Sequence, residues 1–253
     1  MTPSFLLIHS LLFLTGLVAG LVDSIAGGGG LITIPVLLGI GMPPQAALGT
    51  NKLQASFGSG SAMLTFVRSG TVKLHDCAEA ILFTAIGAGL GTVTVQILDP
   101  AFLRVIIPWL LVAVVLYTLL SPRLGYEDIH PRMKRRPFFL LAGLVLGFYD
   151  GFFGPGTGSF WVIALMLGLG FNMTRATAYT KVMNFTSNFV SLLVFIAGGV
   201  VHWREGLVMG VGQFIGARIG AHMVVTKGTR FIRPIFITMV LVITARLIWQ
   251  SYH

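Results

Sequence analysis

Long apolar runs dominate this sequence and constrain its fold more than any other feature. Residues 5–22 and 102–120, for example, each contain at most one charged residue. Only 10% of the 253 residues are charged, whereas a soluble globular chain carries about 25%. The runs are continuous and do not alternate, which argues against a transmembrane β-barrel, and helices are the remaining way to satisfy backbone polar groups in lipid. We therefore predict an all-α, polytopic membrane protein with the lipid bilayer as a partner.

The basic charge of the chain lies in its short loops. The formal net charge is +9, and the basic residues are densest in 121-SPRLGYEDIHPRMKRRP-137. This distribution follows the positive-inside rule for cytoplasmic loops, so we predict no nucleic acid partner. The single cysteine, Cys77, excludes an intrachain disulfide. The first apolar run has no basic segment before it, and we expect it to be retained rather than cleaved as a signal peptide.

The sequence contains an internal repeat. Sliding the chain along itself superimposes 16-GLVAGLVDSIAGGGG-30 on 143-GLVLGFYDGFFGPGT-157, which aligns Asp23 with Asp150. After a small shift of register the match continues and aligns Lys52 with Lys181. We therefore predict two homologous transmembrane repeats, residues 1–126 and 137–253, joined by a basic cytoplasmic linker at residues 127–136.

Each half consists of five apolar elements, and the second element of each half is too short to span a bilayer. About ten residues, at about 1.5 Å per residue, reach only half-way across. The expected elements are residues 5–22, 31–40, 46–67, 78–97 and 102–120 in the first half, and 138–150, 158–170, 176–198, 206–223 and 231–250 in the second.

The relative orientation of the halves depends on the number of elements in each. Five elements invert the second half relative to the first, whereas four would keep the halves parallel. Inversion keeps Lys227, Arg230 and Arg233 on the same side as the other basic loops, and the loop charges therefore favour inverted repeats.

A glycine-rich break precedes the short element in each half. Paired, interrupted apolar segments at equivalent places indicate the midplane binding site of a transporter. A helix that begins at such a break presents unpaired N–H groups and the positive end of its dipole, which favours an anion. In inverted halves the two breaks would meet near the centre. We predict that an anion binds at Gly27, Gly28, Gly29, Gly30, Gly154, Gly156 and Gly158.

Close packing of helices is the alternative role for these glycines. We favour packing for the pairs spaced as GxxxG, because small residues at that spacing let helix backbones approach. The same faces permit a homodimer without requiring one. These pairs are Gly16 and Gly20, Gly87 and Gly91, Gly143 and Gly147, and Gly216 and Gly220.

The third element of each half begins with polar residues. Intramembrane polar residues are costly and indicate function, and a lysine beside amides suits an oxyanion. We therefore add Asn51, Lys52, Lys181, Asn184 and Asn188 to the predicted site. Two alternatives stay open: the lysines could snorkel to the nearest interface, and the amides could merely tie helices together.

Asp23 and Asp150 each precede a glycine break. A negative charge at a helix C-terminus is unfavourable, so each acid is expected to be partnered or protonated. We consider a structural ion pair with a lysine and, as the alternative, a role in proton coupling. The spacing of His, Cys, Asp and Glu predicts no metal site, and we expect no cofactor and no enzymatic activity.

Three segments carry a resemblance to a known family: the glycine break after Asp23, 46-AALGTNKL-53 and 175-RATAYTKV-182. Through them the chain resembles the TauE/SafE family of sulfite exporters over nearly its whole length. The resemblance implies a multi-pass transporter of the bacterial inner membrane that exports sulfite, sulfoacetate or a related organosulfonate by alternating access. The chain departs from the family pattern at GPGTG in the second half. The alternatives are a passive anion channel, a transporter of another small organic anion, and a membrane scaffold.

Overall fold

The computed structural model describes residues 3–103, 105–106, 109 and 130–252, and the side chains of residues 6–228 within those ranges. Its regular structure is entirely helical in this part of the chain. The elements are α1 (Pro3–Ala26), α2 (Gly29–Gly39), α3 (Pro44–Arg68), the short 3-10 helix η1 (Leu74–Cys77), α4 (Ala78–Ile97), α6 (Arg135–Phe152), α7 (Thr157–Leu169), α8 (Met173–Ala197) and α9 (Trp203–Tyr252).

These helices agree with the predicted elements to within a few residues, with two qualifications. The predicted element at residues 102–120 lies largely outside the described residues, as does the start of the predicted linker. In α9 two predicted elements form one run, which is interrupted by the non-helical backbone of Gly228. In addition, α6 begins at Arg135, inside the predicted linker, so the last basic residues of that linker form the first turn of a helix.

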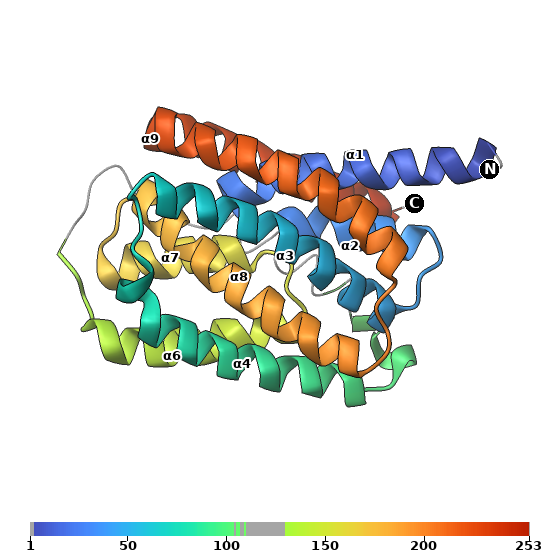
Figure 1. Ribbon diagram of the computed structural model, residues 1–253, viewed down its shortest axis with the longest axis horizontal. Helices are drawn as coiled ribbons and strands as arrows, with labels where there is room; N and C mark the ends of the chain where they lie inside the picture. Colours follow the sequence, from blue (N-terminus) through green and yellow to red (C-terminus); the bar gives the residue numbers. More distant parts are fainter. Residues whose placement is uncertain (1–2, 104, 107–108, 110–129, 253) are drawn as a thin grey trace.

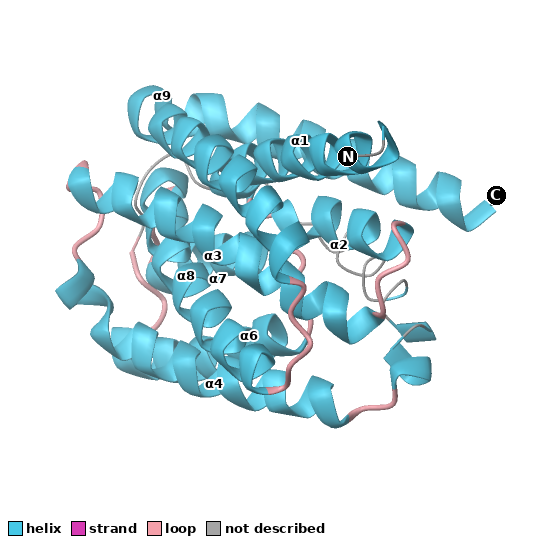
Figure 2. Ribbon diagram, turned by 45° about the vertical axis from the view of Figure 1, so that its right-hand side comes forward, coloured by secondary structure: helices cyan, strands magenta, loops and turns pink. Residues whose placement is uncertain are grey.

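The helices are arranged in three layers (Figures 1 and 2). α1 and α9 lie together on one side, and α4 and α6 lie together on the opposite side. Between these two pairs lie α2, α3, α7 and α8. The middle layer contains both short helices and both polar helices, so the predicted site lies inside the protein.

Glycines bring the helix backbones of the outer pairs into direct contact. A methyl group added to Gly20 of α1 would lie 2.9 Å from the backbone nitrogen of Ala217 in α9. In the other pair, a methyl group on Gly147 of α6 would lie 2.6 Å from the carbonyl oxygen of Thr84 in α4. The predicted packing role of the GxxxG glycines is thereby confirmed. Because these faces are used within the chain, a homodimer would need another surface.

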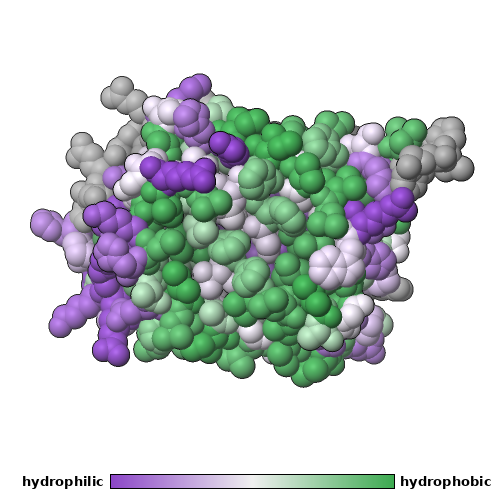
Figure 3. Space-filling model, viewed as in Figure 1, coloured by the Kyte–Doolittle hydropathy of each residue, from purple (hydrophilic) through white to green (hydrophobic). Residues whose placement is uncertain are grey.

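The surface of the protein is apolar around its middle. Leu7, Leu141 and Leu90 are among several large apolar residues with more than half of their surface exposed. Figure 3 shows hydrophobic residues across the middle of one face and hydrophilic residues gathered at both ends. Four helical segments are long and apolar enough to cross a membrane, namely Leu6–Ala26, Leu74–Ile97, Met173–Ala197 and Trp203–Gly228. This exterior fits a lipid bilayer whose normal runs along the long axis.

Helices α2 and α7 are the short elements predicted from the sequence. They contain 11 and 13 residues, which is too few to span about 30 Å of hydrocarbon. α3 has 25 residues, the same number as α8, but it is not among the apolar segments. Its polar residues between 49 and 61 are buried or half-buried for the most part, so they are removed from the lipid by neighbouring helices.

Candidate functional site

The two glycine breaks meet in the interior, as the sequence predicts. Gly27 adopts a positive φ of 76°, which ends α1 and allows α2 to start two residues later. A methyl group on Gly27 would lie 2.6 Å from the Cα atom of Gly158, at the start of α7. Ser159 donates a hydrogen bond of 2.8 Å to the carbonyl oxygen of Ala26 across this contact. The N-termini of both short helices therefore lie side by side.

Two buried ion pairs connect the halves at this point. The ammonium group of Lys52 on α3 lies 2.6 Å from Oδ1 of Asp150, at the end of α6. The ammonium group of Lys181 on α8 lies 2.8 Å from Oδ2 of Asp23, near the end of α1. Each lysine of one predicted repeat thus binds the aspartate of the other. The partners of the first pair are separated by 98 positions in the sequence, and those of the second pair by 158 positions.

The two lysines do not snorkel to an interface, because each has only 1% of its side-chain surface exposed. Each ammonium group also donates a hydrogen bond of 2.5 Å to the backbone carbonyl of its aspartate, at a helix C-terminus where cations are favoured. The expectation that each aspartate is partnered at its helix end is confirmed, and the partner is a lysine. A charge removed from water at this depth requires such a partner, since an unpaired one costs several kcal/mol.

The three predicted asparagines lie in the same region but have different partners. The Oδ1 atom of Asn51 accepts hydrogen bonds from Thr33 at 2.5 Å and from Gln54 at 2.7 Å. The Oδ1 atom of Asn188 accepts one from Lys52 at 3.2 Å. The Oδ1 atom of Asn184 has no hydrogen-bond partner within the described part of the chain, although Asn184 is only 5% exposed.

A small polar cavity lies between the breaks and the polar helices. Its volume is about 30 Å³. Most predicted site residues line it, but Gly28, Gly29, Lys52 and Lys181 do not, because the lysines lie behind their aspartates. The lining residues are Asp23, Gly27, Gly30, Asn51, Ala55, Asp150, Gly154, Gly156, Thr157, Gly158, Asn184, Asn188 and Gln213.

Several site residues are not apparent from the sequence alone. Gln213 enters the cavity from α9, and Ser187 on α8 donates a short hydrogen bond to Oδ2 of Asp150. Ser187 lies three residues after Asn184, which is a helical spacing that could have indicated a shared face. For Gln213, no pattern in the sequence points to the site, because its neighbours are the glycines and apolar residues of a packing face. In the part of the chain that the structure describes, no group of three His, Cys, Asp or Glu residues could hold a metal ion.

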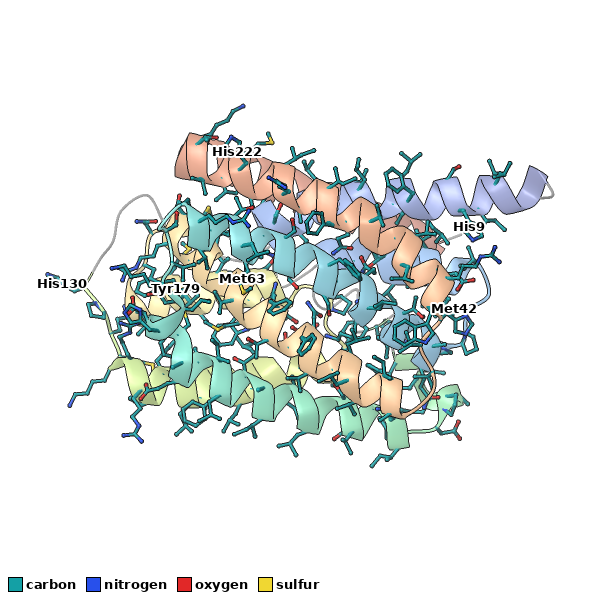
Figure 4. All side chains as sticks on the ribbon, in the orientation of Figure 1. His9, Met42, Met63, His130, Tyr179 and His222 are labelled. Carbon is teal, nitrogen blue, oxygen red and sulfur yellow. The ribbon has the colours of Figure 1, made fainter. Side chains whose placement is uncertain are left out.

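The two ends of the molecule differ, and one of them carries a cluster of basic residues. Figure 4 shows His130 and Tyr179 towards one end and Met42 towards the other. A second, open cavity of about 640 Å³ lies at the His130 end and is lined by Arg132, Lys134, Arg135 and Arg175, among others. The guanidinium of Arg175 packs over the ring of Phe171 at 4.1 Å. By the positive-inside rule we predict that this basic end is the cytoplasmic one.

Comparison with known proteins identifies the family. The sequence profile of the family described as "Sulfite exporter TauE/SafE" matches residues 12–247. The chain belongs to the TauE/SafE family. A Haemophilus influenzae "Probable membrane transporter protein" is 48% identical over 242 residues, which are 96% of this chain and 95% of that protein.

Other relatives of the TauE/SafE chain carry similar names. "Probable membrane transporter protein YfcA" of Escherichia coli strain K12 is 48% identical over 246 residues, which cover 97% of this chain and 91% of that protein. "Probable membrane transporter protein ORF9" of a Sinorhizobium species is 44% identical over 242 residues, covering 96% and 93%. The family resemblance seen in the sequence is confirmed, and the protein is a multi-pass membrane transporter rather than an enzyme.

Proposed function

We propose that this transporter exports a small sulfur-containing oxyanion, such as sulfite, sulfoacetate or a related organosulfonate, across the bacterial inner membrane. The observation that carries the proposal is the meeting of two helix N-termini in a polar cavity with a buried lysine behind each aspartate. Helix N-termini and buried ammonium groups both stabilise an oxyanion. The name of the family, sulfite exporter, gives the substrate class.

The proposed architecture is a pair of inverted repeats, residues 1–126 and 137–253. Three contacts support it: α1 packs on α9, its equivalent α6 packs on α4, which is the equivalent of α9, and α3 packs on its own equivalent α8, so each half makes the same contacts with the other. In Figure 1, α3 runs from right to left, whereas α8 runs from left to right. Figure 4 agrees, because Met42 precedes α3 at one end and Tyr179 follows the start of α8 towards the other. Equivalent helices with opposite directions are what inversion requires.

The proposed binding shell combines backbone amides at the two breaks with polar side chains. Amides at Gly27–Gly30 and Gly154–Gly158 would approach the anion closely, since glycine leaves the backbone accessible. Asn51, Asn184 and Asn188 would donate from their amide groups, and Lys52 and Lys181 would supply positive charge. Asp23 and Asp150 are the two candidates for taking up the coupling proton, because an aspartate that becomes neutral can release its lysine.

Alternating access is the transport cycle that we propose. The cavity is small, with a volume of about 30 Å³, so we expect the breaks to separate when an oxyanion is loaded. The outer pairs α1–α9 and α4–α6 are held by backbone contacts at glycines and would move as rigid units. The middle layer would then open to one end at a time.

The test is sulfite efflux from proteoliposomes that contain the purified protein, with and without an imposed pH gradient. Sulfate and sulfoacetate compete in parallel assays. We expect saturable flux that responds to the gradient, with competition by sulfoacetate. Flux that does not saturate would indicate a passive channel instead. If folded protein moves no sulfur anion, the substrate proposal is wrong while the family membership stands.

A further inference from the structure

We propose that the two Lys–Asp pairs have different roles: Lys181 and Asp23 form the half-site that exchanges with the anion, and Lys52 and Asp150 form a fixed structural tie. This inference rests on the proposed function and refines it, because the sequence repeat alone suggests two equivalent half-sites. The two pairs differ in hydrogen bonding, in burial and in the capping of the neighbouring helix N-terminus, and these differences support the inference.

The two ammonium groups differ in how many of their protons are used. An ammonium group has three donors. Lys52 donates to the carbonyl oxygen and the carboxylate of Asp150 and to Oδ1 of Asn188, so all three donors are used. Lys181 donates only to the carbonyl oxygen and the carboxylate of Asp23 among the described residues. Its third donor is therefore unused within the described part of the chain, although the side chain is almost completely buried and does not line the cavity.

The two aspartates differ in their surroundings. Asp150 has 5% of its side-chain surface exposed, and its second oxygen accepts the short hydrogen bond from Ser187. Asp23 has 15% exposed, and its second oxygen accepts a longer bond of 3.2 Å from the backbone nitrogen of Gly29. Asp23 is thus the more accessible carboxylate and the one with the weaker second partner.

The two short helices differ at their N-termini. Asp23 binds the first amide of α2, whereas no described side chain caps α7, whose first residues line the cavity. Asn184 lies beside this uncapped end, because a methyl group on Gly158 would be 3.1 Å from its Nδ2 atom. Nδ2 is the atom that could donate to an anion, because the buried Oδ1 atom of Asn184, which has no partner among the described residues, can only accept. An uncapped helix end and the amide group of Asn184 therefore lie together at the cavity, and Lys181, which does not line it, can reach an anion there only when Asp23 releases it.

Charge balance defines the exchange step. With both lysines charged and both aspartates ionised, the four groups carry no net charge, and a bound monovalent anion would leave one negative charge uncompensated. A proton taken from solvent by the Asp23 carboxylate restores neutrality and frees Lys181 to bind the anion. The charged groups that face Asp23 are Lys181 on α8 and, across the cavity, Asp150 with its partner Lys52. On α9, Arg218 and His222 are exposed on the surface. Anion and proton binding are then mutually reinforcing.

The test compares neutral replacements of the two pairs, which avoids leaving a buried charge unpaired. The variants are Lys181→Met with Asp23→Asn, and Lys52→Met with Asp150→Asn. Sulfite efflux from proteoliposomes gives the KM and the maximal rate at several pH values, and thermal unfolding in detergent gives the stability of each variant.

For the Lys181 and Asp23 variant we expect the KM for sulfite to rise about 10- to 100-fold, as for loss of a hydrogen bond to a charged group, together with loss of pH dependence. For the Lys52 and Asp150 variant we expect a lower maximal rate and a lower melting temperature. Its KM should stay within about threefold of the wild type, because no contact with the anion is lost. Its pH dependence should be retained.

Equal rises in KM in both folded variants would overturn the inference and leave a symmetric site. Loss of pH dependence only in the Lys52 and Asp150 variant would also overturn it, by reversing the roles. The wild-type protein is tested in the same way. If it does not transport sulfite, and if sulfite, sulfate and sulfoacetate all fail to raise its melting temperature, then both the proposed function and this inference are wrong. These outcomes separate a wrong half-site from a wrong substrate.

Discussion

At the scale of single residues, adjacent glycines in the first break have different physical roles. Gly27 has φ of 76° and contacts the backbone of Gly158, so a side chain there is disfavoured by conformation and by space. Gly28 has φ of −113°, and an added methyl group would lie 3.7 Å from the nearest atom, a side-chain carbon of Leu31. The run of four glycines is therefore not uniformly required.

This difference predicts the effects of two alanine substitutions. Gly27→Ala should destabilise the protein by about 2–5 kcal/mol, from the left-handed conformation and the backbone overlap together, and should abolish sulfite flux. Gly28→Ala should change stability by less than about 1 kcal/mol. Thermal unfolding and fluorescence-detected size-exclusion chromatography measure the stability of both variants. A Gly27→Ala protein with normal stability and flux would show that the breaks need not touch.

At the scale of elements, glycines decide which helices can pack as tight pairs. On α4, Gly91 faces the backbone of α6, where a methyl group would lie 2.8 Å from the nitrogen of Phe152. Gly89, two residues earlier, has only a side-chain carbon of Val190 nearby, at 3.8 Å. The same helix thus carries one glycine that packing requires and one that it does not.

We expect Gly91→Ala and Gly89→Ala to change stability in opposite directions. Gly91→Ala must push α4 and α6 apart and should cost about 1–3 kcal/mol. Gly89→Ala meets no obstacle and should stabilise α4 by up to about 1 kcal/mol through helix propensity. The melting temperatures of the two variants in one detergent provide the measurement. Equal losses would mean that the α4–α6 contact is not the tight interface described above.

At the scale of the whole molecule, the basic end and the apolar middle predict the membrane topology. The loop after α3 and the loop before α9 lie at opposite ends of the molecule (Figure 1), and each carries an exposed residue, Lys73 in the first and His202 in the second. The excess of Lys and Arg at the Lys73 end predicts that this end is cytoplasmic. Parallel repeats would instead leave the basic residues near the break in α9, Lys227, Arg230 and Arg233, on the outside.

Cysteine labelling in intact cells tests this topology. An impermeant maleimide should modify His202→Cys from outside, and it should modify Lys73→Cys only after the inner membrane is permeabilised. The native Cys77 is buried and should stay unlabelled in the folded protein. Labelling of Lys73→Cys in intact cells would place the basic end outside and contradict the orientation.

Local chemistry in the sequence determined the helices and the position of the site along the chain. Three features can be recognised directly in the order of the residues: apolar runs of membrane length, glycine-rich breaks before two short elements, and polar residues at the start of α3 and α8. A helix is stabilised by contacts within one segment, so its location follows from local composition. The predicted repeat likewise pointed to four charged residues, because each has a counterpart of the same type at the aligned place in the other half: Asp23, Lys52, Asp150 and Lys181.

Tertiary structure alone decided how these residues are paired. Lys52 binds Asp150 rather than Asp23, Gln213 enters the cavity from a packing face, and Lys181 keeps a donor that Lys52 has used. These contacts join residues far apart in sequence, and they depend on which helix backbones approach through glycine. Burial then makes each pairing obligatory, since a lysine or aspartate at this depth must find its partner wherever the fold places it.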